Sequence, residues 1–96
     1  MKVYHLSHLK NRDSILKNGI IPHSYDGTHI CYEPRVFVSI KKTDLAFDYV
    51  NYENVDCWEF DIHKTKLTKD NSVTNPNYFY TNEHISSDKI KLIKSY

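Results

Sequence analysis

The stretch VYHLSHLKNRDSILKNGIIP, residues 3–22, decides how this 96-residue chain begins to fold. Its first residues are β-branched and aromatic, and they predict a strand at Lys2–Leu6. Asn11 is an N-cap candidate for a short helix over Arg12–Asn18. Gly19 stands where the left-handed residue that ends a helix belongs. A strand that leads directly into a short helix is therefore predicted.

His5 and His8 lie at the junction between this strand and this helix. Taken alone, they are most simply interpreted as one structural histidine with its hydrogen bonds satisfied and one exposed histidine. The alternative is that a ligand binds at the junction.

Outward from this stretch, alternating apolar residues predict four more strands, at Arg35–Ile40, Val55–Ile62, Asn77–Thr81 and Lys89–Ser95. Thr43 is the N-cap candidate of a second short helix, DLAFDYV, residues 44–50. Residues 22–34 are expected to form a long irregular loop that acts as a lid, since loops of this length in small domains usually serve function.

This order predicts an α+β fold in one domain, residues 1–96, with small antiparallel or mixed sheets and two short helices. A chain of this size has room for one modest core. The residues expected in it are apolar and recur with strand or helix periodicity: Val3, Leu9, Ile15, Leu16, Ile20, Val36, Val38, Leu45, Trp58, Phe60, Ile62, Phe79, Ile90 and Leu92.

The composition excludes several classes of protein. Thirteen basic and twelve acidic residues give a net charge of +1, which provides no broad surface for duplex nucleic acid. Two local lysine clusters are interpreted as solvated faces: Lys64, Lys66 and Lys69, and Lys89, Lys91 and Lys94. No apolar stretch approaches the roughly 20 residues of a membrane span, and no signal-peptide pattern is present, so a cytoplasmic location is expected.

The remaining chemistry-bearing residues carry weaker signals. Cys31 and Cys57 are expected to be reduced thiols. The spacing of the histidines and Cys31 follows no known zinc pattern, so no metal site is expected. The aromatic run Tyr78, Phe79 and Tyr80 is typical of sheet packing, and a base-stacking platform is the less favoured alternative.

The order of motifs resembles the ADP-ribosyltransferase-like superfamily, most closely DarT-type toxins and KptA-like 2′-phosphotransferases. The segments that carry the resemblance are HLSHLKNRDSILKNGIIP, VFVSIKKTDLAFDYV, WEFDI and NYFYTNEHISSDKI. The first is the most specific of the four. The resemblance implies a minimal ADP-ribosyltransferase-like domain that takes NAD as substrate or ligand.

The resemblance also implies roles for individual residues. His5 would hydrogen-bond the adenosine ribose of NAD, with Ser7 and His8 helping to hold the ligand. Ser39 would face the nicotinamide ribose. Tyr49, or a tyrosine of the 25–32 loop, would stack on the nicotinamide ring, since an aromatic face suits a cationic ring.

In transferases of this superfamily, a glutamate in the third motif stabilises the transition state. Asn77 stands at that position here, and Glu83 follows six residues later. An asparagine carries no charge to offset a developing cation. The two are the catalytic candidates.

Three classes of function follow from this resemblance. The first is an enzyme that transfers ADP-ribose from NAD to a nucleic-acid or protein acceptor. The second is a phage-type protein that sequesters a nucleotide, or inhibits, through the same cleft without turnover. The third is an interaction domain with an empty cleft. The oligomeric state is left open.

Overall fold

The N-terminal strand and helix form where the sequence predicts them, and Asn11 stands at the N-cap position of the helix without a side-chain capping hydrogen bond. Strand β1 spans Lys2–His8, a 3₁₀ turn follows at Leu9–Asn11, and helix α1 spans Arg12–Asn18. The computed structural model describes residues 1–25, 30–41, 54–71 and 74–96. The other strands described are β2 (His23–Tyr25), β3 (Ile30–Ser39), β4 (Val55–Asp61), β5 (Thr68–Lys69), β6 (Tyr78–Thr81) and β7 (Lys91–Ser95), with 3₁₀ turns at Lys64–Lys66 and Ser87–Lys89.

Six of these strands form one antiparallel sheet in the order β5-β6-β3-β1-β4-β7, and β2 pairs with β3 outside this path. The α+β class is therefore confirmed. Of the two predicted helices, α1 is present and residues 44–50 lie outside the described residues.

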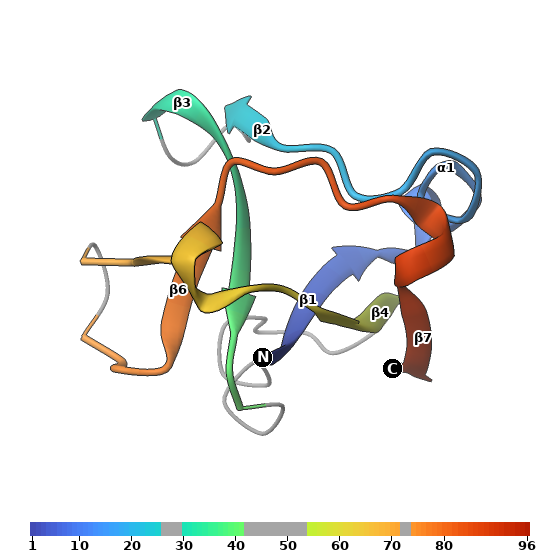
Figure 1. Cartoon of the computed structure of the whole chain (residues 1–96). Helices are drawn as coiled ribbons and strands as arrows, with labels where there is room; N and C mark the ends of the chain where they lie inside the picture. Colours follow the sequence, from blue (N-terminus) through green and yellow to red (C-terminus); the bar gives the residue numbers. More distant parts are fainter. Residues whose placement is uncertain (26–29, 42–53, 72–73) are drawn as a thin grey trace.

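The sheet has two halves that meet at β1 and β3 (Figure 1). β1 pairs with β4 along its whole length, from Lys2 opposite Asp61 to His8 opposite Val55. In the described part of the chain, its register with β3 consists of one pair, Tyr4 with Ser39. β3 instead pairs with β6 over four residues. The sheet therefore parts between β1 and β3 on either side of this pair.

Two apolar clusters lie on opposite faces of the sheet. The larger, on the face that α1 covers through Ile15, contains Val3, Ile15, Ile20, Val36, Val38, Trp58, Phe60, Ile62 and Ile85. The smaller contains Leu6, Val55 and Cys57, with Tyr4, Ile93 and Tyr96 against it. Alternation along β1 explains the division, since successive side chains of a strand point to opposite faces.

Most of the predicted core is confirmed, but two of its leucines are exposed. Leu9 is 37% and Leu16 55% exposed, while Ile15 is buried. The helix has only seven residues, and it packs through the face of Ile15. Leu16 follows about 100° further round the helix and therefore faces solvent. Leu45 lies outside the described residues.

The prediction of an irregular loop over residues 22–34 is wrong for most of the part that the structure describes, because 23–25 and 30–34 lie in strands. β2 pairs antiparallel with the first half of β3, with His23 opposite Arg35 and Tyr25 opposite Ile30. Pro34 lies within β3, although a proline lacks the N–H that a central strand donates. In the folded chain its carbonyl accepts a hydrogen bond from the Asn82 side chain at 2.7 Å.

Gly19 ends α1 in a conformation that requires glycine. Its φ is +80°, and its N–H donates to the Ile15 carbonyl at 2.8 Å. The next residue, Ile20, forms an isolated β-bridge with Ile85, with both N–H···O distances 2.9 Å. A Cβ on Gly19 would lie 2.0 Å from the Ile85 carbonyl oxygen. The helix end and the segment before β7 thus approach as closely as their backbones allow.

Substitution Gly19→Ala is expected to lower the free energy of unfolding by at least about 1–3 kcal/mol, because it adds both backbone strain and a clash with Ile85. Chemical denaturation followed by circular dichroism measures the loss. Lys17→Ala, at an exposed position of the same helix, is the matched control and should leave stability nearly unchanged. Equal stability of the two variants would contradict the close approach.

Candidate functional site

His5 lies where the two halves of the sheet part. Its Nδ1 is 2.7 Å from the carbonyl oxygen of Phe37 on β3, and this contact is open to solvent. A carbonyl oxygen only accepts, so Nδ1 carries the proton and donates. The half-buried ring is therefore held in one orientation between β1 and β3.

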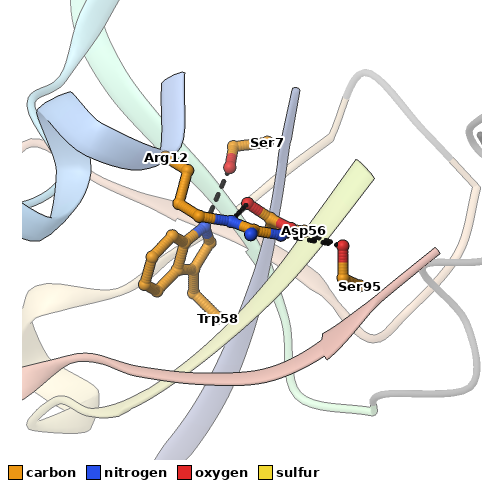
Figure 2. Close-up of polar contacts among 5 residues, drawn as sticks. All are labelled: Ser7, Arg12, Asp56, Trp58 and Ser95. Carbon is orange, nitrogen blue, oxygen red and sulfur yellow. Dashed lines mark hydrogen bonds and ion pairs between the residues drawn. The ribbon is translucent and has the colours of Figure 1, made fainter. Parts of the chain in front are cut away.

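Ser7 is on the same face of β1 as His5, but the fold uses its hydroxyl. The buried Trp58 indole donates from Nε1 to Ser7 Oγ at 2.8 Å (Figure 2). Trp58 is fully buried, and a buried indole N–H requires an acceptor. Ser7 thus provides the acceptor for the indole N–H of Trp58, the largest fully buried side chain.

Arg12, Asp56 and Ser95 form a polar cluster next to this pair (Figure 2). Arg12 donates to both carboxylate oxygens of Asp56, from Nε at 2.9 Å and from Nη2 at 2.6 Å. Ser95 Oγ accepts from Arg12 Nη2 at 2.9 Å and donates to Asp56 Oδ1 at 2.8 Å. The cluster joins α1 to β4 and β7.

The hydrogen bonds from Arg12, followed by that from Ser95, lower the pKa of Asp56 below its ordinary 3.8, although burial of the carboxylate opposes them. Asp56 has no exposed surface, so Arg12 and Ser95, and not water, stabilise its charged form. Sequence analysis missed this cluster. The available signal was Asp56, a charged residue near the beginning of VDCWEFDI, a strand apolar enough to be central.

His8 does not join His5. The two histidines have opposite parity on β1, so their side chains leave opposite faces of the sheet. His8 is exposed at the end of the strand, where it borders a shallow hollow together with Leu9, Lys10 and Asn54.

Ser39 also lies on the opposite face from His5 and Ser7. It pairs with Tyr4, and its neighbour Val38 belongs to the α1-side core. Ser39 is fully buried, and its hydroxyl donates to the Lys41 carbonyl at 2.8 Å and accepts from the Lys41 N–H at 3.0 Å. The predicted cleft that brings His5, Ser7 and Ser39 together is therefore not formed. The predicted stacking residue Tyr49 lies outside the described residues.

The two catalytic candidates lie beyond opposite ends of β6. Asn77 precedes the strand, and its carbonyl accepts from the Ile40 N–H at 3.0 Å. Glu83 follows the strand and pairs with Lys66 at 3.3 Å, with both side chains more than half exposed. Since β6 separates them at about 3.3 Å per residue, they are more than about 10 Å apart. Asn77 and Glu83 therefore lie at opposite ends of β6.

Residues 1–25, 30–41, 54–71 and 74–96 contain no group of three or more His, Cys, Asp or Glu side chains that could hold a metal ion. No helix in these residues is long and apolar enough to cross a membrane.

Comparison with known proteins leaves the family open. No protein-family model matches the chain, and neither the curated proteins nor the solved structures contain a significant match. The resemblance to ADP-ribosyltransferase-like proteins stays a prediction that depends on the motifs themselves.

Substitution Asp56→Asn is expected to lower the melting temperature at neutral pH by about 5–15 °C, since it removes charge-assisted hydrogen bonds from a buried group. Because the pKa of Asp56 is lowered by folding, its contribution is complete above the ordinary value of 3.8. It is lost as the pH falls from there through the lowered pKa.

Thermal unfolding at a series of pH values measures this difference between wild type and variant. Asp61→Asn, at an exposed position of the same strand, is the matched control and should have little effect. A deficit of Asp56→Asn that persists unchanged to the lowest pH would contradict a charged role for Asp56.

Proposed function

We propose that this chain binds NAD or a related nucleotide without consuming it, at the place where the sheet parts between β1 and β3. The position of His5 is the observation that supports this proposal. Its ring bridges the two halves through Phe37, beside the single register pair that joins β1 to β3. A ligand bound there would contact both halves of the sheet at once.

The chemistry of the held imidazole suits a ribose. With Nδ1 donating to a carbonyl, the neutral ring carries its acceptor at Nε2, and protonation turns Nε2 into a donor. A vicinal diol offers both donors and acceptors to such a group. The sequence HLSHLKNRDSILKNGIIP supports NAD in particular, because it resembles the first motif of proteins that bind this nucleotide.

The placement of the acidic candidate favours binding over transfer. Transfer of ADP-ribose develops positive charge on the ribose, and a nearby carboxylate stabilises it. Glu83 is instead engaged by Lys66 on the surface, beyond the end of β6 remote from Asn77. Asn77, at the position of the family glutamate, supplies no charge. This arrangement supports retention of the nucleotide.

Substitution His5→Asn tests the binding site. The asparagine amide can still donate to the Phe37 carbonyl, so the fold should be kept while the imidazole is lost. Removal of a hydrogen bond to the ligand is expected to weaken binding about 3- to 10-fold. Isothermal titration with NAD, ADP-ribose and linear and cyclic nucleotides measures this, with His63→Asn as a remote control. Equal affinities of wild type and His5→Asn would contradict the proposal.

Substitution Glu83→Gln tests the absence of turnover. It should leave nucleotide affinity unchanged, because the Glu83 side chain forms an exposed ion pair with Lys66 and such pairs contribute little. Mass spectrometry of the ligand after incubation with wild type should recover it intact. Hydrolysis or transfer by wild type that falls by orders of magnitude in Glu83→Gln would instead identify Glu83 as catalytic and the chain as a transferase.

A further inference from the structure

We propose that Arg35, Phe37 and Tyr80 form a platform on which bases of single-stranded nucleic acid stack. This platform lies on β3 and β6, on the face of the sheet opposite α1. It involves none of the side chains assigned to nucleotide binding, so the proposal is independent of that function.

The three side chains of the platform lie next to one another. Phe37 and Tyr80 are direct neighbours across the β3–β6 pair, with ring centroids 6.2 Å apart and planes inclined at 58°. The guanidinium carbon of Arg35 lies 4.0 Å from the centroid of the Tyr80 ring. Arginine planes and aromatic rings are the surfaces on which unpaired bases stack.

Phe37 provides the exposed surface of the platform, while Arg35 and Tyr80 are half-buried. Phe37 is 39% exposed, although it lies between Val36 and Val38, each 2% exposed. The part of the Phe37 ring that stays in contact with water is apolar, and a stacked base would cover it. Of the three aromatic residues Tyr78, Phe79 and Tyr80 in β6, Tyr80 is the one that belongs to the platform. Tyr78 is buried, and Phe79 packs against the α1-side core.

Positive charge lies next to the platform, where a phosphate backbone would run. Tyr80 pairs across the sheet edge with Thr68, and Lys64 and Lys66 lie in the turn just before that residue. Glu83 is the acidic neighbour, paired with Lys66 in an exposed contact. Such surface pairs are weak, so a phosphate can compete for the lysine. Stacking with modest positive charge fits a single strand, whose base faces are open, better than a duplex.

Fluorescence anisotropy with labelled oligothymidylate, oligouridylate and a duplex tests the platform at low salt. Both single strands should bind, the duplex should bind more weakly, and affinity should fall as salt is raised. Phe37→Leu keeps an apolar side chain but removes the ring, and it should weaken binding about 5- to 100-fold. Phe37→Tyr should restore binding. Leu16→Ala, at an exposed apolar position on the other face, is the matched control.

Several outcomes would overturn this proposal. They are no binding of either single strand, equal binding by wild type and Phe37→Leu, or preference for the duplex. Self-association of wild type that Phe37→Leu abolishes in light scattering would assign the platform to protein contact instead. His5→Asn should leave oligonucleotide binding intact. Tyr80→Leu, at a platform residue that has no part in the nucleotide site, should weaken oligonucleotide binding and leave NAD binding intact, so failure of either proposal is seen separately.

Discussion

The buried carboxylate of Asp56 is the constraint on which the N-terminal half of the structure depends. A charge inside an apolar strand is costly unless a partner and further hydrogen bonds accompany it. Arg12 supplies both donors of a bidentate pair, and Ser95 completes the cluster. The beginning of α1 is thereby tied to the beginning of β4 and to the end of β7. The path of the chain from β1 into the helix follows from this attachment.

This attachment explains why the strand–helix junction serves structure more than sequence analysis predicted. Ser7 lies opposite Asp56 on the neighbouring strand, and it accepts the indole N–H of Trp58. The residues of the junction that the resemblance assigned to a ligand are thus divided between tasks. Ser7 accepts the hydrogen bond of a buried indole, and the His8 side chain lies on the other face of the sheet. His5 is held by Phe37 at the place where the sheet parts.

Phe37 connects the two proposed sites without mixing them. Its carbonyl orients His5, while its ring lies beside Tyr80 on the surface. A backbone group and a side chain of one strand residue can serve two sites because they point in different directions. β1 and β3 are joined by the single register pair Tyr4–Ser39, so the Phe37 carbonyl can accept a hydrogen bond from a side chain. If the two strands were paired along their whole length, that carbonyl would accept from the backbone of β1 instead.

The sequence by itself determined the features that depend on near neighbours along the chain. Alternation predicted β1, β4, β6, β7 and the second half of β3, but neither β2 nor β5. Gly19 marked the end of α1 because only its backbone adopts φ of +80° easily. The tertiary structure alone decided which side chains meet. Arg12 and Asp56 are 44 positions apart, Ser39 takes its face from its pairing with Tyr4, and Ile30–Pro34 becomes a strand by pairing with β2. Register between distant strands and the partner of a buried charge are set by packing across the whole sheet, which no local pattern encodes.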